Sequence, residues 1–249
     1  MIDIRGVDFR YPDSSKYVLR GLSLQVPDHG ITAIMGANGS GKSTTALCMN
    51  GILIPEAGEI RMNGLSPQDP RSREAVRRAV GVVFQNPNSQ FTSLTVEREL
   101  AFGLENTGIQ RHEMKERVGE CLRLFDLDHC RTIPPSSLSG GEKQKVALAA
   151  VAIMNPLYLV LDEATSLLAP MARRTILRYI TLVADRNRSA IVLITQFPQE
   201  AMLADELMIF REGQVEEKGP PSELFRNGGK LKRLGIPVPL STRLGLNAT

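Results

Sequence analysis

The sequence predicts an α/β fold with a mostly parallel sheet at its centre and a helical lobe inserted into it. Short continuous apolar runs are typical of strands buried on both faces of a parallel sheet, and they occur at 31–36, 80–85, 157–163 and 190–195. Between Gln85 and Pro156 the pattern changes to apolar residues three and four positions apart, which is typical of helices.

Length and composition set broad limits on the kind of protein. The chain has 249 residues, which fits one large domain or a core domain with a smaller inserted lobe. Hydrophobic residues make up 42%, enough for a sizeable core. The net charge is only +3 and no basic run stands out, so we expect no nucleic-acid partner. Four clustered arginines are better explained as a solvated helix face: Arg71, Arg73, Arg77 and Arg78.

Cysteines, histidines and hydropathy exclude several classes of protein. The cysteines are scattered and odd in number, which fits a reducing compartment: Cys48, Cys121 and Cys130. The three histidines lack metal-ligand spacing, so we expect no structural zinc. No stretch approaches the roughly 20 apolar residues of a membrane helix, and the N-terminus does not resemble a signal peptide.

The first and last strands are expected to differ from the central ones. Ile2, Ile4 and Val7 alternate with polar residues, which indicates a half-exposed strand, and "LRGLSLQVP" indicates a second one. These strands predict an antiparallel β subdomain. Near the other end, 206–219 is expected to form a hairpin around Glu212 and Gly213.

The inserted lobe is predicted to be a helical subdomain over about 88–156. Its helices are expected in "TVERELAFGLENTG", "RHEMKERVGECLRLFDL" and "GEKQKVALAAVAIM". We therefore expect a main domain over 1–225, with this subdomain inserted, and a C-terminal extension over 226–249.

A phosphate-binding loop follows the strand predicted at 31–36. The stretch "GANGSGKS" at 36–43 matches G-x-x-x-x-G-K-[ST] and precedes a stretch of helical composition. Its glycines let successive backbone N–H groups face phosphate oxygens, Lys42 supplies a positive charge, and Ser43 offers a hydroxyl to Mg²⁺. The alternative is a chance glycine-rich turn, which the strand and helix on either side disfavour.

Two carboxylates end the buried strand in "LYLVLDEA". Asp162 is expected to hold Mg²⁺ through its water shell. Glu163 is expected to act as the general base on an attacking water. Alone such a pair could simply cap a helix, but with the phosphate-binding loop it indicates nucleotide hydrolysis.

A second anion-binding cradle lies in "SLSGGEKQKVALA". Ser139, Gly140 and Gly141 begin a predicted helix with free N–H groups and a hydroxyl. Because the phosphates already have one cradle in this chain, the second makes sense if it covers the nucleotide of another subunit.

Taken in order, these three motifs closely resemble those of the ATP-binding subunits of ABC transporters, over 1–225. The resemblance implies a P-loop NTPase (RecA-like) core, ATP and Mg²⁺ as cofactors, and a head-to-tail dimer with two ATP molecules between its subunits. It implies that Tyr11 stacks on adenine, and that Gln85 contacts the metal and the attacking water and senses a transmembrane subunit. The implied nucleotide-binding residues are Tyr11, Gly36, Ala37, Asn38, Gly39, Ser40, Gly41, Lys42, Ser43, Thr44, Ser139, Gly140, Gly141 and Glu142. The implied metal ligands are Ser43, Gln85 and Asp162, and the implied catalytic residues are Glu163, Gln85 and Gln196.

A narrower resemblance is to the energy-coupling factor type, the importers of cobalt, nickel and vitamins. It depends on the second glutamine Gln90, on an "AFG-EN" pattern within 84–106, and on the tail at 223–244. It implies an ATPase at the cytoplasmic face of the cell membrane, peripheral, with a second ATPase subunit, a transmembrane coupling subunit and a substrate-binding membrane subunit. For the tail, a loose chain end is the alternative.

Two positions depart from the family pattern. Ala169 stands where the family usually has an aspartate that joins the two sites of the dimer, and Gln196 stands where it usually has a histidine that contacts the γ-phosphate. A glutamine can donate and accept hydrogen bonds but cannot carry a positive charge. We therefore expect a slow or asymmetric ATPase.

Three functions remain open at this point. The first is an ATPase that drives import of a micronutrient, and the second is a catalytically impaired ATP-binding partner in a heterodimer. The third is a non-transport ATPase of the superfamily, which the lack of a long coiled-coil insertion or a second such domain disfavours. If a membrane subunit docks beside the predicted helix that follows Gln90, Glu97 and Glu99 are candidates for its contact surface. Alternatively, these two glutamates lie in a solvated first turn of the helix, where the helix dipole stabilises their charge.

Overall fold

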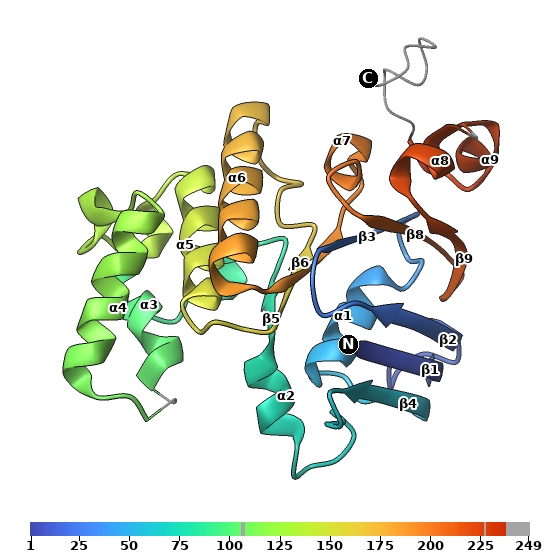
Figure 1. Cartoon of the computed structure of the whole chain (residues 1–249), viewed down its shortest axis with the longest axis horizontal. Helices are drawn as coiled ribbons and strands as arrows, with labels where there is room; N and C mark the ends of the chain where they lie inside the picture. The colour runs from blue at the N-terminus through green and yellow to red at the C-terminus, as the bar shows by residue number, and fades with distance from the viewer. Residues whose placement is uncertain (106–107, 227, 238–249) are drawn as a thin grey trace.

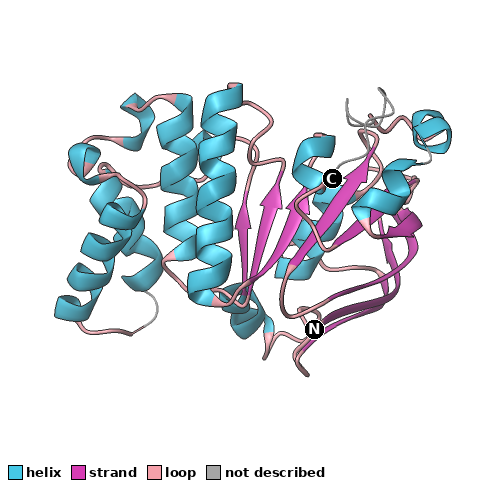
Figure 2. Ribbon diagram, turned by 45° about the horizontal axis from the view of Figure 1, so that its top comes forward, coloured by secondary structure: helices cyan, strands magenta, loops and turns pink. Residues whose placement is uncertain are grey.

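The computed structural model describes residues 1–105, 108–226 and 228–237. Its central sheet has six strands in the order β5-β6-β7-β3-β8-β9, and all neighbouring pairs are parallel except β8 and β9. The strands are β3 (Ile31–Gly36), β5 (Val80–Val83), β6 (Tyr158–Asp162), β7 (Ala190–Ile194), β8 (Glu206–Arg211) and β9 (Gln214–Gly219). Figure 2 shows this sheet between helices. The predicted hairpin is confirmed, and its turn residues Glu212 and Gly213 both have positive φ.

The parallel strands form where the continuous apolar runs predicted them. Every residue of β6 and β7 is buried, because helices cover both faces of the sheet. Parallel strands that run side by side bring their carboxyl ends to one edge, and the loops after β3, β6 and β7 therefore lie together.

A smaller antiparallel sheet has the order β2-β1-β4, from β1 (Ile2–Phe9), β2 (Leu19–Val26) and β4 (Ala57–Met62). Strand β4 was not predicted from the sequence. Helix α1 (Lys42–Asn50) contributes Ala46, Cys48 and Met49 to a core shared by both sheets. The helix that begins in the phosphate-binding loop is thus fixed by apolar packing on both sides.

Helices α3, α4, α5 and α6 gather at one end of the molecule, with α6 beside α5, while α2 lies apart from them below β5 (Figure 1). The helices of the middle of the chain are α2 (Arg73–Ala79), α3 (Val96–Glu105), α4 (Arg111–Leu124), α5 (Gly140–Ala152) and α6 (Pro170–Asn187), with short 3-10 turns η1 (Pro87–Ser89), η2 (Asp128–Cys130) and η3 (Pro135–Ser137). Helices α3, α4 and α5 match the three predicted ones. Helix α6 was not predicted from the sequence, although Ile176, Ile180 and Val183 form its buried stripe.

The C-terminal part of the described chain forms three short helices, α7 (Pro198–Ala201), α8 (Pro221–Arg226) and α9 (Gly228–Arg233). Phe225, Leu231 and Ile236 are buried against Met35 of β3 and Leu207 of β8. The alternative of a loose chain end is therefore wrong for this part of the tail. The rest of the predicted extension, 238–249, and Asn106 of the "AFG-EN" pattern lie outside the described residues.

Within the described ranges, no helix has both the length and the apolar character needed to span a bilayer.

Candidate functional site

The phosphate-binding loop connects β3 to α1 and depends on its glycines. Gly39 and Gly41 have φ of 78° and 103°, values that other residues rarely adopt. At Gly36, a Cβ atom would lie 2.6 Å from the carbonyl oxygen of Phe210 in β8, so only glycine fits. The loop therefore has the curvature that the motif predicted.

Lys42 lies inside this loop. Its Nζ donates to the carbonyl oxygens of Gly36 (2.9 Å) and Ala37 (3.0 Å), and the residue is only 5% exposed. Burial lowers the pKa of Lys42, while the carboxylates of Glu163 and Asp162 oppose that shift. The loop thus holds an ammonium group beside two acidic side chains.

Ser43 and Asp162 meet although they are far apart in the sequence. Ser43 Oγ donates to Asp162 Oδ1 at 2.9 Å. Asp162 is 8% exposed; burial raises its pKa, and the hydrogen bond from Ser43 opposes the shift. A hydroxyl and a carboxylate side by side are oxygen ligands of the kind that Mg²⁺ prefers. The residues present therefore fit a magnesium ion.

Glu163 and Gln196 lie next to each other at the ends of β6 and β7. Gln196 Nε2 donates to Glu163 Oε2 at 3.4 Å. The backbone of Glu163 has φ 50°, and its N–H donates to the carbonyl of Ile194 at 3.0 Å. A non-glycine residue in this conformation is uncommon and is often found at functional sites.

Gln85, which follows β5, has a hydrogen-bond partner that was not predicted from the sequence. Its Nε2 donates to Ser166 Oγ at 3.0 Å, and the N–H of Ser166 donates to the carbonyl of Glu163. Within the described chain, no hydrogen bond joins Gln85 to Ser43 or Asp162. The structure thus places Gln85 against the loop that follows Glu163.

The other residues predicted to bind the nucleotide lie in the loop or close to it. Tyr11 is 40% exposed, its ring packs edge-on against Phe9 with 5.1 Å between ring centroids, and its hydroxyl lies 3.2 Å from Thr44 Oγ1. An exposed aromatic face therefore lies close to the start of α1. Ser40 is buried beneath the loop and its N–H donates to the carbonyl of Ala37, while Asn38 at the tip of the loop is exposed.

Ser139 to Glu142 form a capping box at the start of α5. Ser139 Oγ donates to Glu142 Oε2 at 2.6 Å, and the Glu142 N–H donates back to Ser139 Oγ at 3.4 Å. His129 Nε2 lies 3.0 Å from Glu142 Oε1, a contact that the sequence did not indicate. Hydrogen bonds from Ser139 and then His129 lower the pKa of Glu142 to about 2. In the part of the chain that the structure describes, no hydrogen bond links 139–142 to 36–44.

The two glutamates suggested for a docking surface have different surroundings. Glu97 forms an ion pair with Arg131 at 3.3 Å, and both side chains are about two-fifths exposed. Glu99 is only 6% exposed and accepts the backbone N–H groups of Thr92 and Ser93. Glu99 is therefore a residue of α3 that holds the preceding loop in place, and its burial does not fit a solvated position in an exposed helical turn.

Comparison with known proteins places these motifs in a family. The model of the ABC transporter family matches residues 19–166, a stretch that contains the loop at 36–43, the capping box at 139–142, and Asp162 with Glu163. The chain is 42% identical over 245 residues to the energy-coupling factor transporter ATP-binding protein EcfA1 of Geobacillus kaustophilus, covering 98% of this chain and 88% of that protein. It is 39% identical to EcfA1 of Bacillus subtilis, covering 98% and 87%. The chain belongs to the ATP-binding subunits of energy-coupling factor ABC transporters.

Solved structures of ABC transporter proteins have the same fold. The fold is similar to that of cbiO1 from Clostridium perfringens, part of the ABC transporter complex cbiONQ, with a TM-score of 0.83, 28% identity and 98% of each chain covered. It is also similar to a dimeric bacterial ABC transporter cassette, with a TM-score of 0.79, 25% identity, and 89% of this chain and 99% of that chain covered. The predicted α/β fold and the resemblance are both confirmed. As an ABC ATPase, the subunit binds ATP and couples its hydrolysis to transport.

Proposed function

We propose that this energy-coupling factor subunit hydrolyses ATP with Mg²⁺ to drive import of a micronutrient, either a transition-metal ion or a vitamin, from the cytoplasmic face of the membrane. One observation supports the site above all others. The loop after β3 and the ends of β6 and β7 bring Lys42, Ser43, Asp162, Glu163 and Gln196 to one edge of the sheet.

In the proposed site, Lys42 and the backbone N–H groups of 36–44 hold the phosphates, and Tyr11 stacks on the adenine. Ser43 and Asp162 hold Mg²⁺, which when bound would neutralise charge on the phosphates. Lys42 fits this role because its ammonium group is fixed to two loop carbonyls and faces the acidic pair.

Glu163 is the proposed general base. Its carboxylate can accept a proton from water, and Gln196 beside it can donate to the γ-phosphate while accepting from that water. Gln85 is the proposed additional contact to metal and water, which requires its side chain to leave Ser166. Since Gln196 is neutral, we propose that turnover is slow.

A second ATPase subunit, arranged head to tail, is proposed to complete each site. Ser139, Gly140, Gly141 and Glu142 would cover the nucleotide held by the other subunit. The free N–H groups at the start of α5 support this, as does the absence of any hydrogen bond from these residues to the loop at 36–44 in the described part of the chain.

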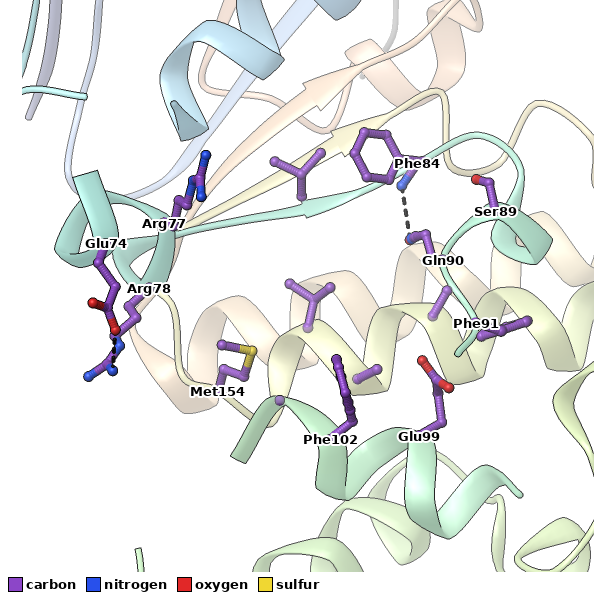
Figure 3. Close-up of a pocket in the computed structure, with 15 residues that line it drawn as sticks. Glu74, Arg77, Arg78, Phe84, Ser89, Gln90, Phe91, Glu99, Phe102 and Met154 are labelled. Carbon is purple, nitrogen blue, oxygen red and sulfur yellow. Dashed lines mark hydrogen bonds and ion pairs between the residues drawn. The ribbon is translucent and has the colours of Figure 1, made fainter. Parts of the chain in front are cut away.

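A groove beside Gln85 supports docking of the transmembrane coupling subunit, which would act with a substrate-binding membrane subunit. The cavity of about 590 Å³ lies between α2 and β5 on one side and α3 and α5 on the other (Figure 3). Phe102 is 48% exposed, and Gln90 accepts the N–H of Phe84 at 3.3 Å, which fixes the loop 85–90 at the rim. An apolar groove with a charged edge suits an amphipathic helix. The subunit would then be peripheral to the membrane.

We further propose that the chain divides as its sequence suggested, into an ATPase domain over 1–225 with a helical subdomain at about 88–156, and an extension over 226–249. The gathering of α3, α4 and α5 at one end of the molecule supports the insertion (Figure 1). The short helix α9, which follows residue 226, supports the extension.

The second candidate function is that of a catalytically impaired ATP-binding partner in a heterodimer. It is favoured by Ala169, which begins α6 without a side-chain cap and offers no carboxylate to a neighbouring subunit, and by the neutral Gln196.

Two variants test the first proposal. Lys42→Ala should clearly lower ATP affinity measured by calorimetry, with Lys115→Ala, an exposed lysine of α4, as the matched control. Glu163→Gln should form a nucleotide-bound dimer that does not turn over, because the amide keeps the shape but removes the base. Parental affinity in Lys42→Ala would contradict the binding site, and parental turnover in Glu163→Gln would place the base elsewhere. Turnover that is absent already in the parent complex, with ATP still bound, would favour the impaired partner.

A further inference from the structure

Glu200 is a buried carboxylate that the proposed chemistry does not use. It lies in α7, four residues after Gln196, and is 1% exposed. A buried charge is costly unless it is paired and fully hydrogen-bonded, so its partners indicate what it holds together.

Two threonine hydroxyls donate to this carboxylate from different loops. Thr165 Oγ1 donates to Oε1 and Thr195 Oγ1 donates to Oε2, each at 2.5 Å. Thr165 belongs to the loop that follows Glu163, and Thr195 directly precedes Gln196. Glu200 therefore joins the loop after β6 to the end of β7.

Arg173 of α6 completes the network. Its Nε lies 3.6 Å from Glu200 Oε1, and its guanidinium carbon lies 3.4 Å from the centroid of the Phe197 ring. One of its terminal nitrogens donates to the carbonyl of Leu168 at 3.2 Å. Such stacked cation–π contacts are favourable when shielded from water.

Gln196 thus lies between two fixed neighbours. Thr195 binds Glu200 and accepts the Phe197 N–H at 3.0 Å, while Phe197 stacks on Arg173. Glu163, by contrast, is fixed by its own backbone hydrogen bond to Ile194. The network therefore fixes the end of β7, next to Gln196, against the loop that follows Glu163.

We infer that Glu200 and Arg173 are positioning residues that hold Gln196 against Glu163 during ATP hydrolysis. The inference rests on the proposed function and adds to it the groups that orient the side chain at the γ-phosphate. A small displacement of a correctly placed group can cost a large factor in rate while leaving binding intact.

The test is a double-mutant cycle in the full-length protein, co-purified with the subunits that it binds in its native membrane. Glu200→Ala removes both threonine contacts and the charge facing Arg173. Glu200→Gln keeps the shape and one hydrogen-bond acceptor, but it replaces the other carboxylate oxygen by an amide donor and loses the charge. In the parent background, Glu200→Ala should lower kcat by about tenfold and Glu200→Gln by less, with KM for ATP within about twofold. In the Gln196→Ala background, the same changes should alter kcat by less than about twofold, because no amide is left to position.

Asp205→Asn is the matched control, since Asp205 also accepts a hydrogen bond, from the Ile31 N–H at 2.8 Å, but at the opposite end of β3. Its kcat should equal that of the parent. If Glu200→Ala does not fold, Glu200→Gln and Phe197→Leu enter the same cycle. An equal drop of kcat in both backgrounds, or a rise in KM that accounts for the whole effect, overturns the positioning role.

Failure of the inference is distinguishable from failure of the proposed function. Parental ATP affinity in Lys42→Ala, or parental turnover in Glu163→Gln, would remove the proposed function itself. If both variants behave as expected and the cycle is additive, only the role of Glu200 and Arg173 is lost.

Discussion

Replacing Gln196 by histidine should raise ATP turnover about five- to tenfold. The parent contact between Gln196 Nε2 and Glu163 Oε2 is long, at 3.4 Å, and Gln196 is exposed, so little ground-state energy depends on it. Exchanging a neutral hydrogen bond to the γ-phosphate for a charge-assisted one is worth about 1 kcal/mol, which gives this factor if the contact strengthens only in the transition state. A cavity of about 300 Å³ lined by Gln196, Asn38 and Ile236 leaves room for the imidazole.

The rise in ATP turnover of Gln196→His should depend on pH, and it should be larger at low pH than at high pH. Glu163 beside the new imidazole favours its charged form, so the pKa of that histidine should lie above its ordinary value of about 6.5. The faster turnover should be complete below this pKa and be lost as the pH rises through it. The parent glutamine does not titrate and should lack this dependence.

The assay is steady-state ATP hydrolysis by the parent, Gln196→His and Gln196→Ala, each with the partner subunits present and across a range of pH. Gln199→His is the matched control, because it adds the same imidazole to an exposed glutamine three residues away. A Gln196→His protein no faster than the parent would show that Gln196 does not limit turnover. Equal rates for the parent and Gln196→Ala would show that the glutamine contributes nothing.

Four further changes test other parts of the structure. Ala169→Asp should raise the free energy of unfolding by about 1 kcal/mol in urea titrations, because α6 begins without a side-chain cap; no change would mean that the new carboxylate does not cap. Glu99→Ala should lower the free energy of unfolding by about 2 kcal/mol, since two backbone N–H groups lose a charged acceptor. Parental stability would show that water replaces the carboxylate. Glu97→Arg should weaken co-purification with membrane partners at unchanged ATP affinity, and intact assembly would remove Glu97 from the docking surface. Glu142→Gln should reduce the loss of stability on acidification, followed as Tm from pH 7 to pH 3. The carboxylate, with its pKa lowered to about 2, stabilises the fold above its ordinary value of 4.5 and loses this contribution as the pH falls towards 2; equal acid sensitivity would contradict this.

Patterns of local physical origin could be predicted from the sequence. The four buried strands have continuous apolar runs because helices cover both faces of the sheet, and the loop at 36–43 has glycines where backbone geometry admits nothing else. The closeness of Ser43 and Asp162 could also be predicted from the sequence, since parallel strands present their carboxyl ends at one edge of the sheet.

Features that depend on distant contacts could not be predicted in the same way. Glu200 has no local signal that marks it as buried, because both of its threonine partners and Arg173 come from other segments or from across a turn. Glu99 resembles any acidic residue in a first helical turn until the preceding loop folds its N–H groups onto it. Helix α6 differs, because its apolar stripe at Ile176, Ile180 and Val183 was visible in the sequence and could have predicted it.

Because residue 169 is an alanine where the family usually has an aspartate, its loop offers no carboxylate to another subunit. The backbone path of the loop is maintained. The Ala169 carbonyl accepts the Arg173 N–H at 2.9 Å, and the Arg173 side chain binds the neighbouring carbonyl of Leu168. Leu167 is 66% exposed and Met171 is 73% exposed, so this surface is apolar where a carboxylate would make it acidic. In the proposed head-to-tail dimer, this loop would join the two sites, as the resemblance to the family implies. A partner that has an aspartate at this position would then supply it to the site built on this chain's loop at 36–44 and would receive none in return. The two sites of such a heterodimer would differ in rate, whereas a homodimer would lack the carboxylate at both sites and show one slow rate.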